Sequence, residues 1–229
     1  MHSALPQFWV EADEVAARIG EAPWLLAFKD VTSPTNERTM IAAAVPWAGM
    51  GNNLPVLIGD DENPSSMPLL LANCCALPFD YTARQKVGGQ HLNFFIVQQL
   101  PILPPSRYEE DYHGVRPADF ISERVLELTY TAHDIAGFAE DMGYVDETGK
   151  VKPPFIWDEE RRLHLRCQLD ALYFHLYGLT REEADYILET FPIVKRHDIE
   201  QYGRYRTKDL ILHYYNAYAA GDMDVWVKG

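Results

Sequence analysis

Hydrophobic and polar positions follow two different patterns along this chain of 229 residues. From about residue 8 to 106, short apolar runs alternate with polar turns, a pattern typical of strands mixed with a helix. Three of these runs predict strands: Trp24 to Val31, Thr39 to Val45 and Leu54 to Ile58. The polar turn of residues 32–38 would join the first two strands, and a loop at residues 49–53 precedes the third.

The segment from Ser65 to about Lys86 predicts a buried helix. Five side chains recur on one side of it at helical spacing, namely Leu69, Leu70, Asn73, Ala76 and Leu77. Gly88 and Gly89 would end this helix, because glycine is common just past a helix C-terminus. The apolar run from Leu92 to Leu100 then predicts a strand, which the following prolines stop.

From about residue 107 to 229 the pattern is helical throughout. The first helix is expected from Asp119 to Met142, with Ser122 as its cap. A polar loop at residues 146–152 separates it from a second helix, Asp158 to Tyr177, which carries a leucine stripe at i, i+4, i+7 and i+11.

Clear end signals follow that second helix. Gly178 would terminate it, and Thr180 with Glu183 has the spacing of a capping box. A last helix is expected from Thr207 to Ala220. The chain is therefore predicted to be α+β, with a mixed α/β module over residues 1–106 and an all-helical part over residues 107–229.

Composition narrows the class of protein. The net charge of -14 argues against non-specific coating of nucleic acid, although it permits a local basic face. Three cysteines without a CxxC pair indicate a reduced, cytoplasmic protein. The longest apolar run is too short to span a membrane, and the N-terminus has no export signal. Because Met1 stands almost directly before an apolar run, we expect an excised fragment of a longer polypeptide.

No motif in the sequence fits a catalytic site or a metal site well. Lys152-Pro153-Pro154-Phe155 has the shape of an amino-methyltransferase motif, but that motif begins with Asn, Asp or Ser, whose oxygen accepts from the target amine. His164, Cys167 and Asp170 recur every third residue on one helix without ligands from elsewhere, so no metal site is predicted. We expect no catalytic residue in this chain.

Two cationic segments are more informative. The segment from Lys195 to Lys208 has five cations against two acids, a local charge of +3, with Tyr202 and Tyr205 between them. It fits either a solvated helix flank or a surface for nucleic-acid phosphates. The triplet Arg84-Gln85-Lys86 fits either a helix C-terminus, where cations are favoured, or a DNA-reading loop.

Three passages resemble the C-terminal region of bacterial type IIG restriction–modification enzymes and related N6-adenine DNA methyltransferases, including those of phage-defence systems. The first is Thr35 to Thr39 (TNERT). The second is Ala83 to Gly89 (ARQKVGG) with His91 to Phe95 (HLNFF) and the Leu100-Pro101 turn. The third is Leu169 to Leu179 (LDALYFHLYGL). Together they span about residues 24–190 in the order that the family shows.

The resemblance implies a target-recognition module with a helical spacer, placed after a methyltransferase domain. This chain has no glycine-rich S-adenosylmethionine loop and no nuclease domain, so the cofactor is expected upstream and none is expected here. The expected partners are double-stranded DNA and the methyltransferase domain of the same polypeptide. The alternative is a helical protein-interaction scaffold that docks that domain or a partner subunit.

On the first hypothesis, the DNA contacts would come from three places. Arg84, Gln85 and Lys86 would approach the duplex, and Gly88 and Gly89 would allow close backbone approach. The neighbouring turn would add Asn36 and Arg38, which fit a structural hairpin equally well. Phosphates would be held by the cations of the later segment, namely Lys195, Arg196, Arg204, Arg206 and Lys208.

Overall fold

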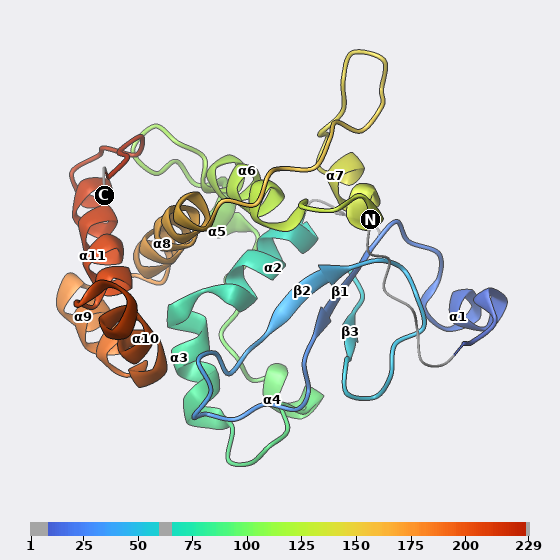
Figure 1. The fold of residues 1–229 in the computed structure, drawn as a ribbon, viewed down its shortest axis with the longest axis horizontal. Coiled ribbons are helices and arrows are strands. Elements are labelled where there is room, and N and C mark those ends of the chain that lie inside the picture. Colours follow the sequence, from blue (N-terminus) through green and yellow to red (C-terminus); the bar gives the residue numbers. More distant parts are fainter. Residues whose placement is uncertain (1–8, 60–65, 228–229) are drawn as a thin grey trace.

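A three-stranded antiparallel sheet lies beside a larger set of helices (Figure 1). The computed structural model describes residues 9–59 and 66–227. The strand β1 (Leu25–Phe28) is central, and β2 (Ala42–Val45) and β3 (Val56–Leu57) pair with it antiparallel on either side. The predicted α+β class is confirmed, and each strand lies inside the range predicted for it.

Helices make up most of the other described residues. Those of the first part are α1 (Ala12–Ile19), α2 (Ser66–Cys75), α3 (Leu77–Lys86), α4 (Phe94–Val97) and α5 (Ser106–Glu109). Those that follow are α6 (Pro117–Thr129), the 3-10 helix η1 (His133–Ile135), α7 (Ala136–Asp141), α8 (Glu159–Leu176), α9 (Arg181–Glu189), α10 (Pro192–Tyr202) and α11 (Arg206–Ala219). The helices α2 and α3 lie between the sheet and the group α8 to α11 (Figure 1).

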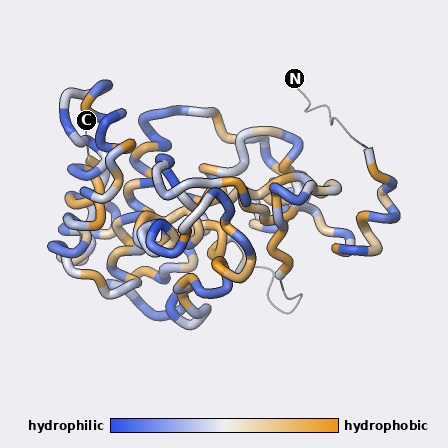
Figure 2. The backbone as a smooth tube through the Cα atoms, turned by 90° about the horizontal axis from the view of Figure 1, so that it is seen from below, coloured by the Kyte–Doolittle hydropathy of each residue, from blue (hydrophilic) through white to orange (hydrophobic). Residues whose placement is uncertain are grey.

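The main hydrophobic core draws on both parts of the chain. Trp24 and Leu26 of the first part share one buried cluster with Tyr173 and Phe174 of α8 and Tyr218 of α11. A smaller cluster lies entirely in the first part, between the sheet, α3 and the segment that carries α4. Hydrophobic stretches accordingly run through the middle of the molecule, with hydrophilic stretches toward its periphery (Figure 2). The predicted boundary near residue 106 stays a prediction.

The helix signals after residue 157 are confirmed. Asp158 accepts a hydrogen bond from the backbone of Arg161 at 2.8 Å and caps α8. Gly178 follows that helix in the left-handed region, at φ +69°, where glycine has no Cβ to clash. Thr180 and Glu183 exchange both hydrogen bonds of a capping box at the start of α9. The last predicted helix is α11, which Gly221 follows at φ +86°.

The single helix predicted from Ser65 to Lys86 is wrong. The chain bends at Ala76, which has an extended ψ of 141°, and so separates α2 from α3. Pro78 explains the break, because proline has no N–H to donate and its ring collides with the carbonyl of Cys74 four residues earlier. Asp170 of α8 stabilises the start of α3, since its Oδ1 accepts from the Leu77 backbone N–H at 2.7 Å.

The helix end predicted at about Lys86 is confirmed, although not with a glycine of positive φ, and the strand predicted after it is wrong. The helix α3 ends at Lys86 with Val87 as its extended C-cap, and Gly88 and Gly89 are not among the residues of positive φ. The run from Leu92 to Leu100 forms the short helix α4 instead of a strand. Only the start of the run pairs with the continuation of β1, since Leu92 N donates to Asp30 O at 2.8 Å, and Leu92, Val97 and Leu100 pack in the smaller core cluster.

The long helix predicted from Asp119 to Met142 is three shorter elements. The first, α6, begins after Arg116, so Ser122 lies inside the helix and is not its cap. It ends at Tyr130, whose carbonyl accepts from Phe155 N at 2.9 Å and whose hydroxyl donates to Lys152 O at 3.0 Å. This tertiary pairing with an extended segment ends the helix.

No helix in residues 9–59 or 66–227 combines the length and the apolarity that crossing a membrane requires.

Candidate functional site

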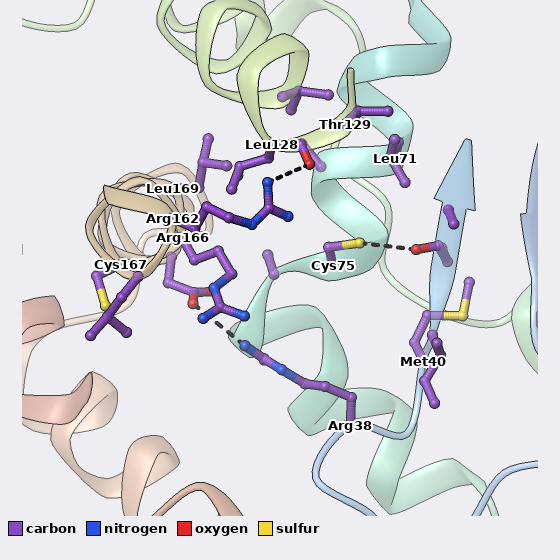
Figure 3. A pocket seen from close by; sticks show the side chains of 18 of the residues that line it. Arg38, Met40, Leu71, Cys75, Leu128, Thr129, Arg162, Arg166, Cys167 and Leu169 are labelled. Carbon is purple, nitrogen blue, oxygen red and sulfur yellow. Dashed lines mark hydrogen bonds and ion pairs between the residues drawn. The ribbon is translucent and has the colours of Figure 1, made fainter. Parts of the chain in front are cut away.

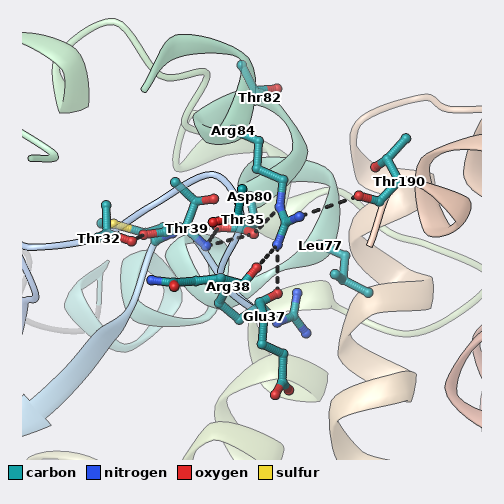
Figure 4. A network of polar contacts seen from close by, with 12 residues as sticks. Thr32, Thr35, Glu37, Arg38, Thr39, Leu77, Asp80, Thr82, Arg84 and Thr190 are labelled. Atoms are coloured by element: carbon teal, nitrogen blue, oxygen red, sulfur yellow. Dashed lines mark hydrogen bonds and ion pairs between the residues drawn. The ribbon is translucent and has the colours of Figure 1, made fainter. Parts of the chain in front are cut away.

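Arg84 lies at the centre of a polar network (Figure 4). Its Nε donates to Asp80 Oδ2 at 3.3 Å, one turn back on α3. Its Nη2 donates to the carbonyls of Asn36 and Glu37 at 2.6 and 2.8 Å, and its Nη1 donates to Thr190 O at 3.4 Å. Four of the five N–H groups of a guanidinium are therefore used within the chain.

Asp80 extends this network to the sheet. It is buried, and its carboxylate accepts from Thr39 N at 2.9 and 3.1 Å and from Met40 N at 2.5 Å. The ring of Phe191 lies 4.2 Å from Arg84 Cζ. The network thus fixes the turn before β2 and the link between α9 and α10 against the end of α3. The structure brings Arg84 and Asn36 together, because Arg84 donates to the Asn36 backbone carbonyl. The Asn36 side chain takes no part in this contact and is exposed.

The residues just after Arg84 face solvent. Gln85, Lys86, Gly88 and Gly89 are exposed, and no described residue forms a hydrogen bond or ion pair with the side chain of Gln85 or Lys86. A shallow hollow of about 450 Å³ lies here. It is lined by Lys86, Gly88, Gly89, Gln90, His91, Asn93, Phe95, Ile96 and Gln99. We call residues 85–99 the amide loop, because most of its exposed polar side chains are amides.

The two glycines leave space beside the amide loop. A Cβ built on Gly88 or Gly89 would meet no atom within 4 Å, and neither residue has a positive φ. Neither the fold nor the local backbone conformation therefore requires glycine at these positions. A missing side chain at an exposed position leaves the main chain open to a ligand.

The amide loop also carries a signal that motif reading missed. No Asp or Glu lies between Asp80 and Glu109, although the chain has 34 acidic residues. The nearest acid in space is Asp30, whose Oδ2 lies 2.7 Å from His91 Nδ1. A count of acids along the sequence would have found this stretch.

The cations of the segment 195–208 have acidic partners. Lys195 and Lys208 both contact Glu189 at 2.6 Å, and these hydrogen bonds hold the pKa of Glu189 below its usual value. Lys208 also lies 3.0 Å from Asp185. Arg206 is buried and its Nη1 donates to Glu160 at 2.8 Å.

Two cations of this segment are held loosely. Arg196 lies 3.9 Å from Glu200, and Arg204 lies 3.9 Å from Asp209. Their side chains are 60% and 65% exposed, so these pairs compete weakly with an external anion. The segment meets the turn before β2 through Glu37, which pairs with His197 at 3.4 Å.

The three residues considered for a metal have separate partners. His164 Nδ1 lies 2.7 Å from the Tyr214 hydroxyl, Cys167 faces Thr207 O, and Asp170 caps α3. Across residues 9–59 and 66–227, no group of three or more His, Cys, Asp or Glu side chains has the placement of a metal site. No family model, no curated protein and no solved structure matches this chain.

Proposed function

We propose that the chain is the DNA sequence-recognition region of a bacterial restriction–modification N6-adenine methyltransferase, without catalytic groups of its own. S-adenosylmethionine would be bound by a domain upstream in the same polypeptide. The observation that carries the proposal is the amide loop, an exposed segment without an acidic residue of its own on a chain of net charge -14. Acidic side chains repel phosphates, so their absence from one surface marks where a duplex is tolerated.

The amide loop has the chemistry for reading bases. The exposed Gln85, Gln90 and Asn93 carry amides, which pair in a bidentate manner with the N6 and N7 edge of adenine. Lys86 would hold a phosphate, and the open backbone at Gly88 and Gly89 would let the duplex approach. Phe95 is 61% exposed and offers an apolar contact for a thymine methyl group.

The remaining expected residues take supporting roles in this proposal. Arg84 fixes the end of α3, where the amide loop begins, and the residues after it would make the direct DNA contacts. Asn36 lies on the turn before β2. Its carbonyl accepts from Arg84, and its side chain is exposed. Among the later cations, Arg196 and Arg204 are the loosely paired ones that would contact phosphates.

A salt titration of DNA binding tests the proposal. Lys86→Ala should lower the slope of log K against log salt by about 0.9, the value for one lost phosphate contact. Gln85→Ala should relax base preference at one position by about 1–3 kcal/mol. Lys150→Ala, which removes an equal charge from an exposed turn, is the matched control. If Lys86→Ala and Lys150→Ala behaved alike, the amide loop would not be the DNA surface.

A second candidate function, docking of another domain, is favoured by one apolar surface. Trp9, Val10, Ile58 and Phe94 are between 47% and 84% exposed around a hollow between α1 and β3. Sedimentation of the chain with and without the upstream domain tests it. Docking would be supported if the chain and the upstream domain sedimented as a complex and Ile58→Ser abolished that complex. It would be contradicted if the upstream domain left the sedimentation of the chain unchanged.

A further inference from the structure

A separate cavity of about 520 Å³ lies between β2, α2, α6 and α8 (Figure 3). It shares no lining residue with the hollow of the amide loop. Much of its wall is apolar, with Ala42, Ala43 and Ala44 on β2 and Leu71 and Leu163 opposite. Its size is that of a small-molecule site, which spans about 300–1,000 Å³.

Three arginines line this cavity. Arg162 and Arg166 lie one turn apart on α8, and Arg38 reaches it from the turn before β2 (Figure 3). Arg162 Nη1 donates to Leu128 O at 2.9 Å, and its guanidinium lies 3.6 Å from the centre of the Trp157 ring. Arg166 is exposed, and no described residue forms a hydrogen bond or ion pair with it.

Arg38 contributes an unused donor. Its Nη2 lies 3.7 Å from Asp170 Oδ2, while its Nη1 is buried and has no hydrogen-bond partner among the described residues. A buried donor without a partner is costly, so such groups often mark the place of a ligand. An anionic oxygen near Arg38 would satisfy it.

Two acids line the cavity, Asp170 and Glu37, and each also has a partner outside the three arginines. Asp170 Oδ1 accepts from the Leu77 backbone at 2.7 Å, its Oδ2 lies 3.7 Å from Arg38 Nη2, and burial raises its pKa. Glu37 pairs with His197 at 3.4 Å. Burial, together with the neighbouring Arg166, lowers the pKa of Arg162. The lining thus sets three arginines against two acids.

We propose that this cavity binds a small organic anion, whose carboxylate or phosphate head is held by Arg38, Arg162 and Arg166. The planar guanidinium groups suit bidentate contact with either head. The body of the ligand is apolar or aromatic and packs against the alanines of β2. None of the residues of this site belongs to the amide loop, and Arg38, which the sequence suggested as a DNA contact, lines this cavity instead.

Cys75 provides a reporter for occupancy. It lines the cavity and is exposed, whereas Cys74 and Cys167 are 0% and 1% exposed. Burial raises the pKa of the Cys75 thiol to about 11, so alkylation with N-ethylmaleimide is expected to be slow, but it should still label the exposed Cys75 ahead of the buried Cys74 and Cys167. A ligand in the cavity covers that thiol, so it should slow the labelling.

Calorimetric titration of the chain with phenyl phosphate and with benzoate tests the proposal and identifies the head. We expect binding of at least one of them, slower labelling of Cys75, and weaker binding of inorganic phosphate and phenol. Arg166→Gln should weaken binding about tenfold or more, since it removes a charged donor, and Arg162→Gln should do likewise. Arg181→Gln, at an exposed position of α9, is the matched control for charge on another helix.

Three results would overturn the proposal. The first is no binding of either anion to the folded chain. The second is equal affinity for phenyl phosphate and inorganic phosphate, which would exclude the apolar body. The third is equal affinity in Arg166→Gln and the unaltered chain. Because no described residue forms a hydrogen bond or ion pair with Arg166, thermal unfolding of Arg166→Gln should match that of Arg181→Gln, which checks that the variant is folded.

Discussion

Asp80 and Arg84 lie one turn apart on α3, and their side chains form an ion pair that is 1% and 7% exposed. The pair joins three segments that are distant in sequence. Asp80 holds the backbone of Thr39 and Met40, while Arg84 holds the Asn36–Glu37 carbonyls and Thr190. The end of α3 is therefore a structural junction, and the amide loop begins at its last residues.

The first prediction separates the two cations of this helix end. Arg84→Ala should lower the free energy of unfolding by about 3–5 kcal/mol, because it leaves Asp80 as an unpaired buried charge. Lys86→Ala should change it by less than about 0.5 kcal/mol, since its side chain is exposed. Urea denaturation of both variants measures the difference. Equal midpoints would show that the Arg84 network does not hold the junction.

A second prediction contrasts two glycines. Gly137 of α7 packs against Pro23, where an added Cβ would lie 2.5 Å from the Pro23 carbonyl oxygen. Gly137→Ala should therefore cost about 1–3 kcal/mol of stability through overpacking. Gly88→Ala, with open space around it, should be neutral or stabilise by about 0.4–1 kcal/mol.

The same Gly88→Ala variant also bears on DNA binding. If the duplex approaches the backbone of the amide loop, the variant should bind DNA more weakly at unchanged or higher thermal stability. Unchanged affinity would mean that the duplex does not come close to this backbone.

The sequence correctly predicted the helix ends that depend only on residues a few positions apart. The capping box of Thr180 and Glu183 needs only residues three apart, and the glycine end of α8 needs only the left-handed conformation at Gly178. Both are present as predicted. The break at Ala76 also had a local signal in Pro78, which the helical spacing of the apolar positions outweighed.

Tertiary partners determined what the sequence did not show. Residues 92–100 have strand-like composition, but only their start pairs with the continuation of β1, through Leu92 N and Asp30 O, while Val97 and Leu100 pack in the smaller core cluster. Arg84 has the composition of a DNA contact, but its hydrogen bonds reach residues 48 positions before it and 106 after it. The cavity of the three arginines likewise joins the turn before β2 to α8, and no spacing along the chain predicts that meeting.

A third prediction concerns Asn73, a buried polar residue in the apolar helix α2. Its Nδ2 donates to the Tyr177 hydroxyl at 2.6 Å, and its Oδ1 accepts from Leu103 N and the Tyr108 hydroxyl at 3.1 Å. Asn73→Leu keeps a similar volume but leaves these donors unpaired, so it should cost about 2–3 kcal/mol. Asn216→Leu, at an exposed position of α11, is the control. Thermal or urea unfolding measures both, and equal stability would contradict a structural role for the buried amide.

The last prediction concerns pH and rests on His175 of α8. Its ring stacks on Tyr215 at 3.9 Å, its Nε2 donates to Tyr215 O at 2.9 Å, and burial lowers its pKa below the ordinary value of 6.5. As the pH falls below 6.5, the unfolded chain takes up a proton at this residue before the folded chain does. Stability should therefore decrease with falling pH until the folded-state pKa is passed.

His175→Gln should remove this part of the pH dependence, because glutamine can still donate to Tyr215 O and does not titrate. Denaturation midpoints of both proteins between about pH 7.5 and 5 give the difference, since other groups titrate alike in both. His213→Gln, at an exposed position of α11, serves as the control and should leave the slope as it is. If His175→Gln and the unaltered chain lost stability in parallel, His175 would not be the group responsible.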